Sequence, residues 1–389
     1  MAATISAAGS ISVPAKQQAG TPWYVWCAVL AVTSAMIGGH WDVSWHSSIG
    51  RDTFWTPAHI AIYMCGVLSG IAFGYLILST TFSPQSPLRA SSIRVWGFRG
   101  PLGAFIAAWG GIVMLTSAPF DNWWHNAYGL DVQIVSPPHM VLFLGLYFVV
   151  AGTIILISGH ANRVAGKERT TAYWLFLYVA GMGLIMLMFM IMEFTSRAFL
   201  HTARPYFVIA LLAPIPLSLA SRATPVRYAA TAVAALYTFV LIALILILPL
   251  FPAEPKLGPV YQHVTQFIPP QFPILILAPA LALDLFWART KAWNTWLLSI
   301  ASSAVFLAVL LLVEWPFANF LMSPLARNRF FGTIYFWYSL PPGSYTARYL
   351  LVPQDISGLL EGLMLAFVAG VFAFRFGFWR GDWMGRIKR

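Results

Sequence analysis

The sequence predicts an all-α integral membrane protein with about ten transmembrane helices arranged as five hairpins. Hydrophobic residues make up 59% of the 389 residues and charged residues only 9%, which is far from the balance of a soluble domain. Apolar runs long enough to cross a bilayer recur along the whole chain. Tryptophan and tyrosine lie where these runs meet polar loops, as in the aromatic belts of membrane proteins. The net charge of +11 therefore points to membrane topology, and we expect no nucleic acid partner.

A membrane span needs about 20 apolar residues, and ten runs meet this requirement. They cover residues 23–40, 56–80, 100–119, 137–158, 172–193, 205–221, 228–252, 269–288, 293–315 and 356–378. Residues 1–22, rich in Ala, Ser and Gly, predict a flexible N-terminal tail without a signal-peptide cleavage pattern. The remainder divides into a four-helix region at 23–165, which carries the motifs described below, and a six-helix region at 166–389.

The positions of lysine and arginine predict the orientation of these spans. Most of the 23 basic residues fall in the loops after even-numbered spans and in the C-terminal tail. Short cytoplasmic loops carry the excess of positive charge in membrane proteins. Both termini should therefore be cytoplasmic, and the loops after the first and third spans should lie on the opposite side.

The first two hairpins repeat one pattern of acidic and histidine residues. The two copies are Asp42, His46 and His59, and Asp121, His125 and His139. Residues four apart share one face of a helix, so each Asp and the first His of its copy can point at one atom. Thr-Pro and Ser-Pro pairs open the next helices and put the last His in a first turn. Each hairpin thus offers one carboxylate and two imidazoles, a ligand set that suits copper, iron or zinc.

Three further residues are weaker candidates near these sites. Asp52 and Asp131 follow the two motifs at equal spacing and are expected either to cap a turn or to orient a ligand from behind. His40 could substitute as a ligand in the first site, but its counterpart in the repeat is Pro119. A single histidine near a helix start is more often a hydrogen-bonded interfacial residue. Most of the chain's 8 histidines lie in these two stretches, however, which favours metal binding.

The first motif resembles a known family. The string D-x-x-W-H at residues 42–46, followed by RDT at 51–53 and TPxHI at 56–60, is similar to the C subunit of the copper-dependent membrane monooxygenases. These enzymes oxidise methane, ammonia or short hydrocarbons. The resemblance covers about residues 20–160, and it implies that Asp42, His46 and His59 bind copper and form the catalytic centre.

The second motif departs from the family at one position. The family's second site uses Asn, His and His, which correspond to Asp121, His125 and His139. Asp121 adds a negative charge where the family has an amide. In the second half of the chain, residues 267–287 and 338–349 are more weakly similar to parts of the A subunit of the same enzymes.

The resemblance implies a copper-dependent monooxygenase, or a component of one that is active only with partner subunits. O2 and a small apolar substrate would be consumed, and copper rather than zinc or iron would be the metal. A membrane quinol would supply electrons, a cupredoxin-like B subunit would be a partner, and the complex would be a trimer of protomers. The location would be a bacterial cytoplasmic or intracytoplasmic membrane, with the metal loops periplasmic. The alternative is a non-catalytic metal-binding, transport or structural membrane subunit that retains the motif.

Overall fold

The computed structural model describes residues 20–50, 52–129, 134–196, 199–256, 263–290, 292–332, 334–335 and 354–388. Its helices are α1 (Trp23–Ser48), α2 (Pro57–Phe82), α3 (Leu102–Tyr128), α4 (Pro137–Ala161), α5 (Gly166–Met190), α6 (Ala203–Leu212), α7 (Pro214–Ala223), α8 (Ala229–Ile247), α9 (Leu277–Arg289), α10 (Thr295–Leu321) and α12 (Ile356–Met384). An antiparallel pair, β1 (Ile93–Val95) and β2 (Phe98–Gly100), lies between α2 and α3. Most of the predicted tail, up to residue 19, and the segment 338–349 lie outside the described residues.

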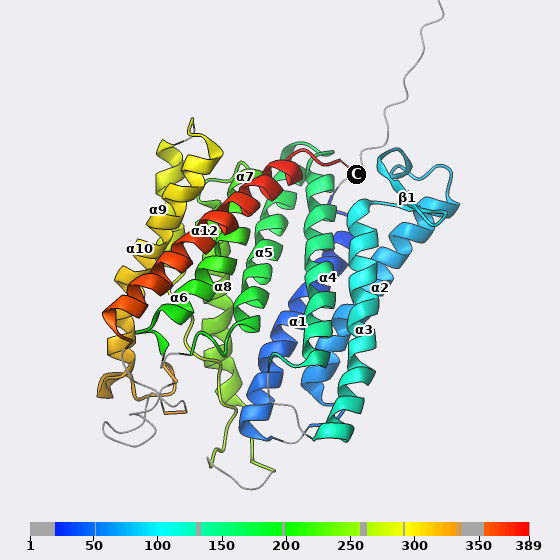
Figure 1. The fold of residues 1–389 in the computed structure, drawn as a ribbon. Coiled ribbons are helices and arrows are strands. Elements are labelled where there is room, and N and C mark those ends of the chain that lie inside the picture. Colours follow the sequence, from blue (N-terminus) through cyan, green and yellow to red (C-terminus); the bar gives the residue numbers. More distant parts are fainter. Residues whose placement is uncertain are drawn as a thin grey trace, which may run out of the picture.

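The bundle of long apolar helices confirms the predicted all-α membrane class. Among the described residues, nine helical segments are long and apolar enough to cross a membrane, with α6 and α7 forming one of them. Figure 1 shows α1 to α4 on one side of the bundle, α9 and α10 on the other, and α5 and α8 between them, while α12 runs obliquely across the front. Large apolar side chains such as Leu30, Leu312 and Phe372 are exposed on the helix surfaces, as expected of residues that face lipid.

The predicted span at residues 269–288 is wrong in its first half. Helix α9 begins only at Leu277 and has 13 residues, so it is about 20 Å long against the roughly 30 Å of a bilayer core. Three prolines between residues 269 and 273 explain the difference. A proline has no N–H to give to a helix, and it disfavours helical geometry in the residue before it. The fourth predicted hairpin therefore pairs α8 with a half-length helix that follows a non-helical segment.

This non-helical segment is tied to the end of α1. Ile268 donates its N–H to Ser48 Oγ at 2.8 Å, and its carbonyl oxygen accepts a bond of 2.5 Å from Ser44 Oγ. The backbone N–H of Lys256 also donates to the carbonyl oxygen of Ile49 at 2.9 Å. Non-helical backbone that is buried away from water requires such partners. The second half of the chain thereby fixes the last turn of α1.

Side chains of the second half accept hydrogen bonds from two backbone N–H groups near the end of the same segment. The N–H of Ile274 donates to the hydroxyl oxygen of Tyr237 on α8 at 3.1 Å. The N–H of Leu275 donates to Glu314 Oε2 on α10 at 2.8 Å. Glu314 is fully buried, and this bond gives the intramembrane carboxyl group a structural role at the break before α9.

Helices α3 and α4 cross at very short distance. A Cβ atom built on Gly110 would lie 2.6 Å from the carbonyl oxygen of Gly145, and one built on Gly145 would lie 2.6 Å from the N atom of Met114. Small residues allow transmembrane helices to approach in this way and to gain dispersion energy along the whole contact. The crossing fixes the position of α3 relative to α4.

Candidate metal centre

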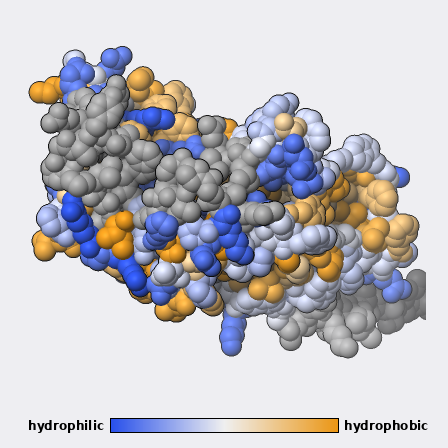
Figure 2. Space-filling view, turned by 90° about the horizontal axis from the view of Figure 1, so that it is seen from below, coloured by the Kyte–Doolittle hydropathy of each residue, from blue (hydrophilic) through white to orange (hydrophobic). Residues whose placement is uncertain are grey.

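The two predicted sets of ligands lie at the same end of the bundle. The first cluster (Asp42, His46 and His59) joins the end of α1 to the start of α2, and the second cluster (Asp121, His125 and His139) joins the end of α3 to the start of α4. This end lies opposite the C-terminus (Figure 1). Figure 2 looks onto it and shows hydrophilic residues intermixed with hydrophobic ones, as expected where helices leave the apolar part of a membrane.

Local sequence explains how each cluster forms. Helix α1 extends eight residues beyond its predicted end at residue 40, to Ser48, so that Asp42 and His46 are one turn apart on the same face. Thr56 is the residue before α2, and Pro57 is its first residue, which places His59 in the first turn. Helix α3 likewise continues through Pro119 to Tyr128, and Ser136 and Pro137 open α4 before His139.

In the first cluster, one carboxylate faces two imidazoles. Asp42 Oδ1 lies 3.1 Å from His59 Nε2, and Asp42 Oδ2 lies 3.8 Å from His46 Nε2. Ligands bound at about 2.1 Å to one tetrahedral ion lie about 3.4 Å from each other. The separations in the first cluster fit three ligands that could share one ion.

Asp52 belongs to the same group of side chains. Its Oδ2 lies 3.5 Å from His46 Nε2 and 3.4 Å from His59 Nε2, and its side chain is only 8% exposed. From the sequence, Asp52 was expected either to cap a turn or to orient a metal ligand through a hydrogen bond. In the structure its carboxylate lies as close to both imidazoles as two ligands of one metal ion lie to each other.

The hydrogen bond of His59 to Thr53 leaves its Nε2 atom facing two carboxylates. His59 Nδ1 lies 2.9 Å from the carbonyl oxygen of Thr53. Since a carbonyl oxygen only accepts, Nδ1 carries the ring proton. The Nε2 lone pair of a neutral His59 then faces the oxygens of Asp42 and Asp52. A second ring proton or a bound metal cation would offset this negative charge, and either would also fit the approach of His46 to the same carboxylates.

The second cluster repeats the arrangement with one carboxylate. Asp121 Oδ1 lies 3.4 Å from His125 Nε2 and 3.6 Å from His139 Nε2. Asp121 Oδ1 and His125 Nε2 are buried and have no hydrogen bond within the described residues. Buried polar atoms without a hydrogen bond are costly unless an ion pair or a bound group satisfies them. Their convergence fits a cation. Asp131, the counterpart of Asp52, lies outside the described residues.

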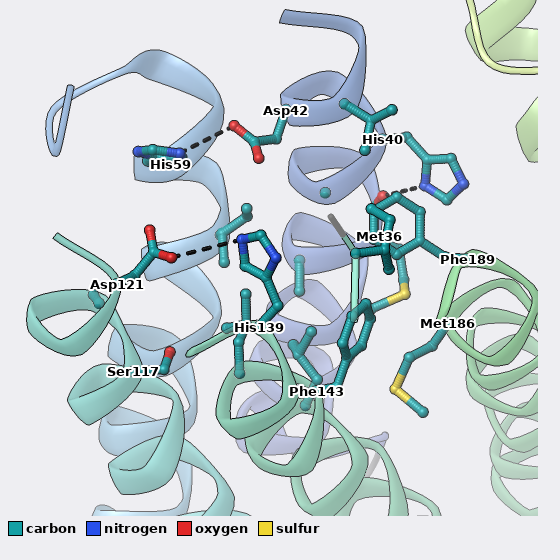
Figure 3. Close-up of a pocket in the computed structure, with 18 of the residues that line it drawn as sticks. Met36, His40, Asp42, His59, Ser117, Asp121, His139, Phe143, Met186 and Phe189 are labelled. Atoms are coloured by element: carbon teal, nitrogen blue, oxygen red, sulfur yellow. Dashed lines mark hydrogen bonds and ion pairs between the residues drawn. The ribbon is translucent and has the colours of Figure 1, made fainter. Parts of the chain in front are cut away.

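A cavity of about 90 Å³ separates the two clusters. Asp42 and His59 face it from one side, and Asp121 and His139 from the other (Figure 3). The remaining wall is mostly apolar and includes Ile62, Leu142, Phe143, Leu146 and Met186. A ligand in this cavity would touch both clusters, and His40, Tyr63 and Ser117 are further polar residues of its lining.

His40 lies apart from the first cluster. Its Nδ1 bonds to the carbonyl oxygen of Met36 at 2.8 Å, and its ring packs on Phe189 with 4.8 Å between ring centres. Figure 3 shows His40 and Phe189 at the wall of the cavity away from Asp121. Among the described residues, His40 is not part of a group of converging ligand atoms.

The sequence analysis missed the contribution of α5 to this cavity. Met186 and Phe189 come from α5, which lies far from both motifs in the sequence. Their only signal was membership of an apolar run, which every span shares. The role of Glu193 was also not predicted. Its carboxylate accepts a hydrogen bond of 2.9 Å from the backbone N–H of Ile134 and so anchors the chain just before α4.

Replacing Asp52 with asparagine is expected to weaken metal binding by the first cluster. The substitution keeps the size of the side chain but removes a charge that lies within 3.5 Å of both imidazoles. Loss of a supporting carboxylate typically lowers metal affinity about 10- to 100-fold. Competition with a chelator of known affinity measures the change. Asp382→Asn, on α12, is the matched control, and equal affinities for the two variants would contradict a role for Asp52.

Comparison of the chain with models of known protein families, with curated proteins and with solved structures finds no match.

Proposed function

We propose that this chain is a membrane copper monooxygenase, or the metal-bearing component of one, that inserts one atom of O2 into a small apolar substrate. The observation that carries the proposal is the pair of Asp/His/His clusters facing a single apolar cavity at one end of the bundle. The sequence motif in the first hairpin, which resembles the C subunit of these enzymes, supports the assignment of the reaction.

Asp42, His46 and His59 would hold the catalytic ion, with Asp52 in contact with the same imidazoles. Bound copper would supply the one-electron chemistry that O2 requires before it reacts with a C–H or N–H bond. Imidazole and carboxylate ligands accept zinc and iron as well, so the resemblance selects copper. The carboxylate of Asp121 places a negative charge in the second cluster, which favours the more highly charged state of an ion there.

The overall reaction sets the requirements for partners. One oxygen atom enters the substrate and the other leaves as water, so two electrons and two protons must be supplied. A membrane quinol, oxidised to the quinone, provides both. A cupredoxin-like subunit and assembly into a trimer of protomers follow from the same resemblance.

The apolar wall of the cavity suits a substrate that dissolves in lipid. Ile62, Leu142 and Phe143 offer no hydrogen bonds from their side chains, so they favour an alkane or a similarly small uncharged molecule and exclude excess water from the clusters. The basic residues near the C-terminus and in the connections at that end favour a cytoplasmic position for that side. The clusters then face the periplasm of a bacterial cytoplasmic or intracytoplasmic membrane.

The test is metal analysis with electron paramagnetic resonance on the purified protein, followed by oxidation assays in native membranes with ¹⁸O2. We expect copper in the protein and one labelled oxygen atom in the product of a short alkane or of ammonia. Copper without oxidation in native membranes would support the non-catalytic alternative. Zinc in both clusters, with no paramagnetic signal after oxidation, would contradict a copper enzyme.

A further inference from the structure

A second cavity lies directly behind the one between the clusters. It has a volume of about 50 Å³ and is formed by α1, α5, α8 and the non-helical segment before α9. Ile185 and Met188 contribute apolar wall, whereas Tyr237 and Gln271 bring polar groups. Non-helical backbone at membrane depth is found where it is buried in protein or lines a cavity, and here the break before α9 does line one.

Two residues, His40 and Phe189, line both cavities and so form the wall between them. His40 is 8% exposed and is held by its bond to Met36. The Phe189 ring packs on His40 and on Phe143, with ring centres 4.8 and 5.8 Å apart. In Figure 3 the rings of His40 and Phe189 stand next to each other at the edge of the first cavity.

Phe189 is the movable part of this wall. His40 sits in the middle of α1 and is fixed by a hydrogen bond, whereas Phe189 lies in the last turn of α5 and is held by ring contacts. Its other neighbour is Gly39, where a Cβ atom would lie 3.6 Å from the Phe189 ring. The side chain of Phe189 therefore fills the space that would otherwise connect the two cavities.

The volumes show what this wall does. An apolar cavity of about 150 Å³ admits benzene, whereas the cavity beside the clusters has about 90 Å³. The two cavities joined, with the ring of Phe189 removed, would reach the volume that benzene needs. We propose that Phe189, packed on His40, separates the cavities and sets the upper size of the molecule that can bind beside the Asp/His clusters. That this molecule is a substrate rests on the proposed function, but the size limit does not.

Halogenated probes of two sizes test the size limit in the full chain. Crystals are soaked with bromoethane or with bromobenzene, and anomalous scattering locates the bromine without interference from detergent. In the unchanged protein we expect bromoethane between the clusters and no bromobenzene there. In Phe189→Ala we expect bromobenzene to occupy the joined space, between Asp42 and Ile274.

Two further variants keep this test decisive. Met192→Ala enlarges only the second cavity, since Met192 lines that cavity alone, so bromobenzene should still be absent beside the clusters. Phe189→Leu keeps apolar packing on α5 if the alanine variant fails to fold, and it should admit bromobenzene at lower occupancy. Bromobenzene beside the clusters of the unchanged protein, or its absence from both Phe189 variants, would overturn the proposal.

The outcome is independent of turnover. Bromobenzene binding as expected in a protein that lacks copper and oxidation activity would leave the size limit standing and remove the proposed function. If the protein oxidises short alkanes but its Phe189 variants bind nothing larger than bromoethane, the proposed function stands and the size limit falls.

Discussion

Replacing Asp42 and His59 together with alanine is expected to remove the metal of the first cluster and to leave that of the second in place. The double substitution takes away the pair with the shortest separation, 3.1 Å between Asp42 Oδ1 and His59 Nε2, and leaves His46 without a second ligand on a neighbouring helix. Replacing a residue that only hydrogen-bonds to a metal ligand already lowers metal affinity about 10- to 100-fold. The loss of two ligands should therefore lower the affinity further. The measurement is metal content per chain after gel filtration.

Mirror variants show whether the clusters are separate. Asp121→Ala with His139→Ala should remove the other ion, and all four substitutions together should remove both. His40→Gln is the matched control, because His40 faces Met36 and Phe189 and lies outside the cluster. Full metal content in the Asp42 and His59 variant, or its loss in the His40 variant, would show that the ligands are other residues.

Replacing Gly145 with alanine is expected to destabilise the bundle by about 3 kcal/mol or more, at or above the usual cost of overpacking. The added Cβ atom would lie 2.6 Å from the backbone N atom of Met114 and 2.8 Å from the carbonyl oxygen of Gly110. Backbone atoms of a packed helix cannot turn aside as a flexible side chain can, so α3 and α4 must separate. Thermal unfolding in detergent measures the loss, and metal retention by the second cluster reports the displacement of His139 from Asp121.

Gly70 and Gly74 on α2 provide the matched control. Both are helical glycines, and a Cβ atom added to either would meet no other atom within 4 Å. Alanine there should leave stability unchanged or raise it slightly, because alanine favours helix. Equal melting temperatures for Gly145→Ala and Gly74→Ala would show that the close crossing contributes nothing to stability.

Spacing within the sequence was sufficient to predict which residues form each cluster. Asp42 and His46 are one helical turn apart, and the Thr56-Pro57 pair starts the next helix in the position that returns His59 to them. These are local rules of helix geometry and helix starts. They place each ligand on its helix, whereas the packing of α1 on α2 and the bonds of Ile268 to α1 fix how the helices meet. The same rules place Asp121, His125 and His139, although the helices carrying the motifs run further than the apolar runs suggested.

Features that depend on tertiary contacts were not predictable in the same way. Composition alone makes residues 269–288 look like a span, yet the prolines at its start and the partners on α1, α8 and α10 favour an extended entry into the bundle. The approach of Asp52 to both imidazoles depends on how the loop between α1 and α2 folds back. The part played by Phe189 requires knowing that α5 packs against α1 and α4.

The hydrogen bonds between Ile268 and the serines of α1 mean that the contacts of the two clusters become complete at different stages of synthesis. The second cluster is carried by α3 and α4, with Glu193 bonded to the chain just before α4, so these residues all belong to the first half of the chain. The turn of α1 that carries His46 is held by hydrogen bonds between Ile268 and the serines Ser44 and Ser48. The two serines precede Ile268 by more than two hundred residues in the chain. The contacts that hold the last turn of α1 therefore form only after residue 268 has been made, whereas the bond between Glu193 and Ile134 beside the second cluster joins residues that are made earlier.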